Sequence, residues 1–438
     1  MAILKNELLE TMSVAQAVES LFPEPVSLRI EAYDGSIAGD VDAELTARIV
    51  SPQALSYIIT APGEVGMARA YLTGAIEVDP LDPGDPYEAL KAIQMAIGKI
   101  SVRPMDVPAL IRSLGREVLQ VPPLPKTESP SRLRRVTRGL THSKGRDADA
   151  IHHHYDVSNR FYEMVLGPSM AYTCAVYDND EMTLEEAQRN KFDLVARKLD
   201  LKPGMRLLDV GCGWGGMAMH AAQEYGAKVL AVTLSTDQAQ WANDAVAKAG
   251  LSGQVEIRHQ DYRDVTESDF DAISSIGLTE HIGVKNYPAY FGFLYGKLRP
   301  GARLLNHCIT WENNRRNGGL ERLGMRPSFV DRYIFPDGEL AGSGTIVSIM
   351  EDTGFEVEHH ENFRNHYART TRAWAQNLSA NWDACVAEVG EERARVWGLY
   401  LAGSSFGFER NNIQLHQVLG VKLDGNDNRY PWRHSFGA

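Results

Sequence analysis

A glycine-rich segment in the middle of the chain carries the clearest chemical signal. The segment Asp209–Gly216, DVGCGWGG, follows an apolar run and precedes a helical pattern. Glycines at such a turn let the backbone bend sharply and approach a ligand without a Cβ in the way. The next apolar run ends at Thr233-Leu234-Ser235, without the acidic residue that would bind the ribose of NAD. The segment therefore predicts a cofactor turn of another kind, against the alternative that the turn only packs a helix on a strand.

The elements around this turn form an alternating pattern. From about residue 190, helical stretches separate five short apolar runs: RLLDV, KVLAVTLS, VEIRHQD, FDAISSIG and ARLLNHCIT. Strands that alternate with helices are typical of a doubly wound α/β sheet, in which the ligand lies at the carboxyl ends of the strands. The turn at residues 209–216 falls at such an end.

Composition narrows the function classes. The 438 residues include 45 Lys and Arg against 57 Asp and Glu, which gives 45 − 57 = −12, and 44% are hydrophobic. Such a chain folds around real cores and is a poor candidate for non-specific nucleic-acid binding. No signal peptide or membrane span is predicted, and the four scattered cysteines suggest neither a disulfide framework nor a structural metal. We therefore expect a cytoplasmic protein.

The order of these patterns predicts four regions. Short strands and helices at 1–120 indicate a small N-terminal α+β domain, and a Pro-rich and basic linker follows at 121–150. The main α/β domain covers 151–420 and a C-terminal tail covers 421–438. The linker holds six basic residues and no acidic one between 132 and 146, namely Arg132, Arg134, Arg135, Arg138, Lys144 and Arg146. They form either a solvated linker surface or a contact with anionic lipid headgroups.

Three segments in order, LLDVGCGWGG, VTLS and HQDYRD, resemble the class I S-adenosylmethionine (SAM) methyltransferases. The resemblance implies a Rossmann-like doubly wound sheet. It also implies a SAM site made of Tyr172, Thr173, Asp209, Gly211, Gly213, Gly215, Thr233, Leu234, Gln238, Asp261 and Tyr262.

Segments outside the cofactor turn are similar to a particular family, the cyclopropane-fatty-acyl-phospholipid synthases. These segments are HHYDVSNRFY at 153–162, AYTCA at 171–175, EHIG at 280–283, KNY at 285–287, HCI at 307–309, YIFP at 333–336 and IQL at 413–415. The resemblance implies that residues 151–420 are a SAM-dependent catalytic domain and that residues 1–120 associate with lipid or membrane. The implied reaction is methylation of a cis double bond in a phospholipid acyl chain, through a carbocation that aromatic rings can stabilise.

The same resemblance implies how the carbocation loses a proton. In that family a bound bicarbonate ion is the base, and the matching positions here are Cys174, Glu280, His307, Ile309 and Tyr367. Each has an ordinary alternative: Cys174 as a small buried residue, for example, or His307 as a hydrogen-bonded core histidine.

Three positions near these residues depart from the family pattern. Thr173 replaces a serine, Thr279 replaces an aromatic residue and Asn306 replaces an aliphatic one. We expect these changes to favour the actinobacterial branch that makes 10-methylene or 10-methyl (tuberculostearic-type) chains over the branch that makes cyclopropanes. The expected partners are an unsaturated phospholipid membrane at its inner face, a reductase if the product is a methylene, and a second copy in a homodimer, but no nucleic acid. Methylation of a small amine or hydroxyl compound, or a non-catalytic lipid-binding module, remains the alternative.

Overall fold

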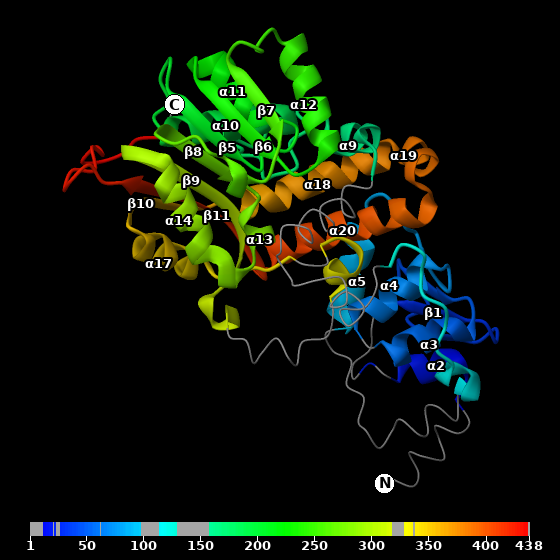
Figure 1. Cartoon of the computed structure of the whole chain (residues 1–438). Helices are drawn as coiled ribbons and strands as arrows, with labels where there is room; N and C mark the ends of the chain where they lie inside the picture. Colours follow the sequence, from blue (N-terminus) through cyan, green and yellow to red (C-terminus); the bar gives the residue numbers. More distant parts are fainter. Residues whose placement is uncertain are drawn as a thin grey trace. The chain divides into compact units, whose positions relative to one another are not determined.

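The computed structural model describes residues 12–20, 22, 27–61, 63–97, 114–128, 157–317, 328–335 and 338–436. They fall into two compact units (Figure 1). Unit 1 combines Met1–Ser131 with Arg326–Ile334 and Gly390–Gly403, and unit 2 combines Arg132–Met325 with Phe335–Val389 and Ser404–Ala438. The six basic residues of the predicted linker and residues 153–156 of the HHYDVSNRFY segment lie outside the described residues. The domain boundaries stay predictions.

Unit 1 is a small α+β unit. Its sheet has the order β2-β1-β3-β4, with β1 at Arg29–Ala32, β2 at Ile37–Gly39, β3 at Thr46–Ile49 and β4 at Ile76–Asp79. Its helices include α2 (Val14–Glu19), α3 (Pro52–Thr60), α4 (Glu64–Leu72), α5 (Tyr87–Ile97) and α16 (Phe329–Tyr333). Ile30, Leu55 and Tyr57 lie in its core.

Unit 2 is built on a seven-stranded sheet with the order β10-β11-β9-β8-β5-β6-β7. The strands are β5 (Arg206–Val210), β6 (Lys228–Thr233), β7 (Val255–His259), β8 (Phe270–Ile276), β9 (Leu298–Trp311), β10 (Phe355–Asn362) and β11 (Ile413–Lys422). The five from β5 to β9 are parallel, whereas β11 pairs antiparallel with both β9 and β10. The predicted doubly wound sheet is confirmed, because β8 and β6 flank β5 on opposite sides and so place a switch point at its carboxyl end.

Helices cover both faces of this sheet, as Figure 1 shows for the labelled helices α11, α12, α14 and α17. Successive side chains of β5 point to opposite faces of the sheet, which explains this arrangement. Leu207 packs into one hydrophobic core and Leu208 into the other. One face carries α10 (Leu184–Lys198), α11 (Gly216–Tyr225) and α12 (Thr236–Lys248), and the other carries α14 (Tyr287–Lys297) and α17 (Ser343–Thr353).

Unit 2 also contains the helices α9 (Asn159–Leu166), α13 (Thr279–Ile282), α18 (Arg364–Ala380) and α19 (Trp382–Val389). Helix α20 (Glu391–Glu409) is divided between the units: its residues up to Gly403 belong to unit 1 and those from Ser404 belong to unit 2. Helix α18 packs against α9 and β11. No described helix is both long and apolar enough to cross a membrane.

Candidate active site

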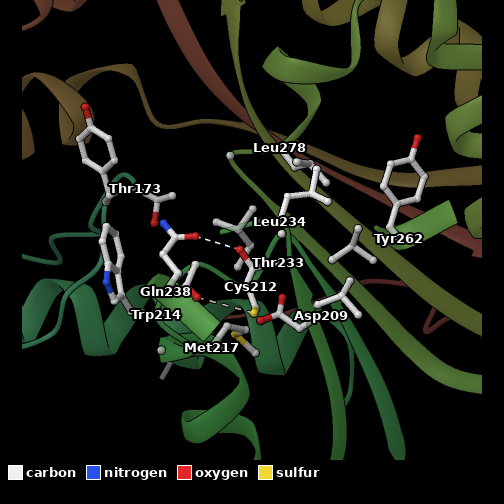
Figure 2. A pocket seen from close by; sticks show the side chains of 18 of the residues that line it. Thr173, Asp209, Cys212, Trp214, Met217, Thr233, Leu234, Gln238, Tyr262 and Leu278 are labelled. Carbon is white, nitrogen blue, oxygen red and sulfur yellow. Dashed lines mark hydrogen bonds between the residues drawn. The ribbon is translucent and has the colours of Figure 1, made fainter. Parts of the chain in front are cut away.

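A pocket opens at the carboxyl ends of β5 and β6, where the glycine-rich turn leads into α11 (Figure 2). Gly211, Gly213 and Gly215 all have positive φ angles, of 76°, 55° and 80°, a region that residues with a Cβ rarely adopt. At Gly211 a Cβ would also lie 3.2 Å from the side chain of Leu278, another residue that lines the pocket. The turn therefore requires glycine for its backbone conformation and, at Gly211, for the space next to the pocket.

Nine of the eleven residues predicted to bind the cofactor line this pocket. They are Tyr172, Thr173, Asp209, Gly211, Gly213, Thr233, Leu234, Gln238 and Tyr262. The other two are not among its lining residues. Gly215 precedes α11, and the Asp261 carboxylate binds Arg263, whose Nε and Nη2 donate at 2.8 and 2.6 Å. Their predicted contact with the cofactor stays a prediction.

Asp209 is the buried acid of the pocket. Its Oδ1 accepts a hydrogen bond from Ser274 Oγ at 2.7 Å, and its Oδ2 is buried with no hydrogen-bond partner among the described residues. Burial raises the pKa of Asp209 to about 6, against the opposing effects of Ser274 and Lys191. A buried carboxylate oxygen without a donor is costly. Asp209 Oδ2 and the glycine turn would fit a ligand that carries hydrogen-bond donors, such as the ribose hydroxyls or the ammonium group of SAM.

The sequence prediction missed a buried lysine in the same pocket. Lys191 Nζ donates to Thr173 Oγ1 at 2.8 Å and lies 3.7 Å from the centre of the Phe192 ring. Burial lowers the pKa of Lys191 to about 7. A signal for it exists, because Lys191 falls on the apolar stripe of α10, four residues before the buried Val195.

Glu280 and Ile309 of the predicted base site are in direct contact. The backbone N–H of Ile309 donates to Glu280 Oε1 at 2.6 Å, while Oε2 is buried without a hydrogen-bond partner among the described residues. Burial raises the pKa of Glu280 to about 7, against the hydrogen bond from Ile309. Burial therefore favours the protonated form of Glu280, and Oε2 is the oxygen open to that proton because Oε1 accepts from Ile309.

His307 lies two residues before Ile309 on β9 and is also fully buried. Its Nδ1 is 3.2 Å from Gln417 Nε2, and its Nε2 has no hydrogen-bond partner within the described part of the chain. Burial, and then the charges of Lys191 and Lys198, hold the pKa of His307 well below its usual value. Glu280 and His307 thus each present one buried polar atom that needs a partner.

Cys174 contacts Phe363, the residue that precedes α18, and Tyr367 lies in that helix. The Cys174 thiol can donate its one hydrogen to the carbonyl oxygen of Ala175 at 3.1 Å or that of Phe363 at 3.8 Å, and burial raises its pKa, so a nucleophilic thiolate is disfavoured. Tyr367 follows Phe363 by one helical turn, and its ring stacks on Phe408 with 4.6 Å between centres.

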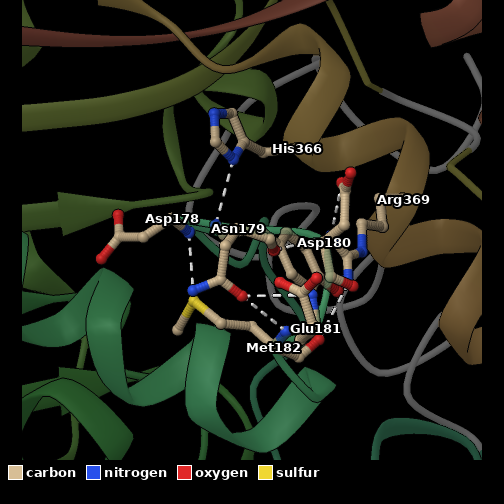
Figure 3. A network of polar contacts seen from close by, with 8 residues as sticks. Asp178, Asn179, Asp180, Glu181, Met182, His366 and Arg369 are labelled. Carbon is tan, nitrogen blue, oxygen red and sulfur yellow. Dashed lines mark hydrogen bonds and ion pairs between the residues drawn. The ribbon is translucent and has the colours of Figure 1, made fainter.

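A polar network fixes the loop after Cys174 on α18 (Figure 3). The His366 ring accepts the Tyr177 N–H at 3.1 Å, and Thr370 Oγ1 accepts the Ala175 N–H at 3.0 Å. The Arg369 guanidinium donates to the carbonyl oxygens of Asn179, Asp180 and Met182. These contacts set the backbone at Cys174 against the helix that carries Tyr367.

Thr279 and Asn306, two of the residues that depart from the family pattern, form a hydrogen bond with each other. Thr279 Oγ1 donates to Asn306 Oδ1 at 2.6 Å, and Asn306 Nδ2 donates to Cys308 Sγ at 3.2 Å. Both residues are fully buried, beside Glu280 and His307 in sequence. Two of the three predicted departures from the family pattern, Thr279 and Asn306, thus form one hydrogen-bonded pair.

Comparisons with known proteins agree with this architecture. Residues 142–418 match the family described as mycolic acid cyclopropane synthetase. A probable fatty acid methyltransferase of Mycobacterium tuberculosis is 54% identical over 92% of this chain and 94% of its own, and one from Pseudomonas putida is 35% identical over 96% and 98%. The Escherichia coli cyclopropane-fatty-acyl-phospholipid synthase is 37% identical over 61% and 66%.

One solved structure of a related enzyme has a similar fold and a sequence more than 30% identical to this chain. The mycolic acid cyclopropane synthase CmaA1 in complex with SAH and CTAB has a TM-score of 0.58 and 32% identity, over 62% of this chain and 97% of that one.

The glycine turn gives a first prediction. Gly211→Ala places a Cβ at positive φ and against Leu278, so we expect SAM, the cofactor that the sequence predicts, to bind about tenfold more weakly or worse, a loss of ~1.4 kcal/mol. Gly250→Ala is the matched control, since Gly250 also has a positive φ (71°) but lies outside the pocket lining and has open space around its Cβ. Calorimetric titration with SAM measures both. Equal affinities of the two variants would contradict the assignment of the turn.

The pKa of Glu280 gives a second prediction. Because burial raises this pKa from 4.5 to about 7 in the folded state, ionisation costs native stability as the pH rises between these values. Glu280→Gln removes that cost, so its stability relative to wild type should increase across the window by on the order of 3 kcal/mol at most. Urea unfolding at pH 5 to 8 measures the difference.

Glu267→Gln is the control for this experiment. Hydrogen bonding to Arg258 lowers the pKa of Glu267 to about 2, so its contribution is lost only as the pH falls below about 4.5. The stability of Glu267→Gln relative to wild type should stay constant from pH 5 to 8. A constant difference for Glu280→Gln as well would show that Glu280 is not buried in this way.

Proposed function

Because the chain belongs to the family of mycolic acid cyclopropane synthetases and is a SAM-dependent methyltransferase, we propose that it methylates cis double bonds of unsaturated acyl chains in phospholipids. The observation that carries the proposal is the hydrogen bond from Ile309 to Glu280, which holds a buried carboxyl with its second oxygen unused among the described residues. A methyltransferase acting on an amine or hydroxyl compound has no need for a separate site that accepts a proton from carbon.

The pocket residues have distinct roles toward the cofactor. SAM supplies an electrophilic methyl group on a positively charged sulfur. The backbone at Gly211 and Gly213 would allow close approach, and Asp209 Oδ2 would accept from the donors of the cofactor. Thr233 and Gln238, which hydrogen-bond each other at 2.9 Å, would border the adenosine part.

The alkene is a weak nucleophile, so the chemistry after methyl addition has to be controlled by the site. The adjacent chain carbon becomes a carbocation, which must lose a proton to reach a neutral product. We assign bicarbonate as the proton acceptor. A neutral Glu280 can donate from Oε2 to that anion, whereas an ionised one would repel it.

The other predicted base-site residues complete this proposal. Ile309 acts through its backbone N–H, which orients Glu280, and His307 offers Nε2. Cys174 contributes through its backbone, because its thiol hydrogen is directed to a carbonyl oxygen. Tyr367 contributes its hydroxyl. A small anion held by such groups can reach a proton on the acyl chain that a side chain fixed to the protein would not reach.

The product is proposed to be a 10-methylene chain, with cyclopropane as the second candidate. Direct loss of a proton from the added methyl group closes a cyclopropane. A hydride shift from the methylated carbon to its cationic neighbour, followed by the same proton loss, leaves an exocyclic methylene. The buried Thr279–Asn306 pair favours the second course in our proposal, since it replaces apolar side chains beside Glu280. A reductase would then complete a 10-methyl chain.

The proposed partner is the inner face of a phospholipid membrane, and a homodimer is the proposed assembly. The test of the function uses purified chain, labelled SAM, phospholipid vesicles with unsaturated chains and, separately, soluble amines and catechols. Label in the acyl chains supports the proposal. Label only in the soluble compounds would establish the alternative methyltransferase, and no transfer at all would favour a non-catalytic lipid-binding module.

The base site gives a third prediction. Removing dissolved carbonate should lower turnover, and added bicarbonate should restore it. Glu280→Gln and Tyr367→Phe should lower turnover about tenfold or more while SAM affinity stays near wild type, because they remove contacts to the anion and not to the cofactor. Glu267→Gln, a change at the protein surface, should match wild type. A wild-type rate without carbonate, with both site variants silent, would mean that another group takes the proton.

The Thr279–Asn306 pair gives a fourth prediction. Thr279→Val removes the hydroxyl at nearly constant volume, and Thr279→Phe restores the aromatic side chain of the family pattern. Both should shift the product ratio toward cyclopropane, with the larger shift for Thr279→Phe, as measured by gas chromatography and mass spectrometry of the fatty acids. If Thr279→Phe does not fold, Thr279→Val still tests the role of the hydroxyl. An unchanged ratio in both would remove Thr279 from product control.

A further inference from the structure

Three buried or half-buried polar residues form a row across neighbouring strands of unit 2. Glu361 on β10 is paired in register with Gln417 on β11, and Gln417 is paired with His307 on β9. Gln417 has no exposed surface and His307 is 1% exposed. Side chains at paired positions of adjacent strands lie on the same face of the sheet, so the three can interact in sequence.

A fourth residue reaches this row from the helix layer. Lys198, in the last turn of α10, is fully buried and places its Nζ 2.5 Å from Glu361 Oε2 and 2.6 Å from Gln417 Oε1. Lys198 forms an ion pair with the Glu361 carboxylate, which favours the ammonium form and opposes the lowering of the lysine pKa by burial. An ammonium group has only donors. The oxygen of the Gln417 amide must therefore face Lys198.

This orientation decides which nitrogen of His307 carries a proton. With its oxygen on Lys198, the Gln417 amide directs its NH₂ group to His307 Nδ1 at 3.2 Å. An NH₂ group donates only, so Nδ1 must accept and cannot carry a hydrogen. A neutral imidazole with an unprotonated Nδ1 has its hydrogen on Nε2, the nitrogen without a hydrogen-bond partner among the described residues.

We propose that Lys198 and Gln417 are positioning residues that fix His307 as a neutral donor, with its proton on Nε2, toward the proton-accepting anion of the site. This role in the reaction rests on the proposed function, whereas the tautomer follows from the hydrogen bonds alone. The opposite tautomer would present a lone pair to an anion and repel it.

The neutral state of His307 has a chemical purpose here. An imidazolium group would pass its proton to the bound anion, which could then no longer accept the proton from the substrate. Lys198 opposes that state in two ways: its positive charge disfavours a second cation nearby, and its hold on Gln417 keeps an NH₂ group against Nδ1. His307 can thus bind the anion and leave it basic.

The direct test is nuclear magnetic resonance of protein labelled with ¹⁵N in histidine. Long-range ¹H–¹⁵N correlations distinguish the two neutral tautomers and the imidazolium, and His307→Asn identifies the His307 signals by their loss. Wild type at pH 7 to 8 should show His307 with Nε2 protonated and Nδ1 bare. A protonated Nδ1 would overturn the proposal.

Variants test the part played by the lysine and the amide. In Lys198→Met the Gln417 amide is free to rotate, so the other tautomer should become populated, and Lys198→Arg should retain the wild-type pattern. Gln417→Glu presents only acceptors to Nδ1, so a proton should appear there; this variant serves if Lys198→Met does not fold. Lys202→Met, at an exposed lysine, is the control with a wild-type pattern. An unchanged His307 spectrum in Lys198→Met or Gln417→Glu would overturn the positioning role.

Activity in buffers of defined bicarbonate content separates this proposal from the function. Lys198→Met should raise the bicarbonate concentration for half-maximal rate about tenfold, the effect of a weakened hydrogen bond to a charged group, with SAM affinity unchanged. Lys198→Arg should restore the wild-type value. If wild type shows the predicted tautomer but no dependence on bicarbonate, the tautomer stands and the proposed function fails. If bicarbonate dependence is present but equal in all variants, the positioning role fails and the function stands.

Discussion

Burial of ionisable groups behind the carboxyl ends of the central strands is the constraint on which the site depends. Removal from water disfavours charge, and it raises the pKa of Asp209 to about 6 and of Glu280 to about 7 while it lowers the pKa of Lys191 to about 7. Burial also lowers the pKa of His307. The result is a region in which charge is disfavoured and hydrogen-bonding capacity is only partly used, which suits a reaction that passes through a cation in an apolar substrate.

The sheet and its helices supply the rigidity that such a site needs. Strand β9 carries both His307 and Ile309, and α13 begins one residue before Glu280, so one strand and one short helix define half of the predicted base site. The other half is set by α18, to which Arg369 and His366 fasten the loop after Cys174. Groups held on strands and helices keep their geometry better than groups on loops.

Much of this arrangement could be predicted from the sequence, because it is encoded locally. The glycine pattern at 211–215 and the alternation of apolar runs with helices gave the sheet, the turn and most of the pocket. However, membership of a motif did not predict which of its residues line the pocket. Gly215, which precedes α11, and Asp261, which binds Arg263, belong to the predicted segments but are not among the residues that line the pocket. The network around His307 was also missed, since Lys198, Glu361 and Gln417 are far apart in the chain and meet only through sheet register and helix packing. Lys191 and Lys198 lie seven residues apart on the buried stripe of α10, and that spacing was the available signal.

The central claim is that the proton lost from the carbocation comes from the methyl group that was just added. Incubation with vesicles of cis-monounsaturated phospholipid and SAM carrying a fully deuterated methyl group tests this claim most directly, with mass spectrometry of the released fatty acids as the readout. Both proposed products, methylene and cyclopropane, should retain two of the three deuterium atoms. A product that retains all three would show that the proton leaves from another carbon, and would contradict the account.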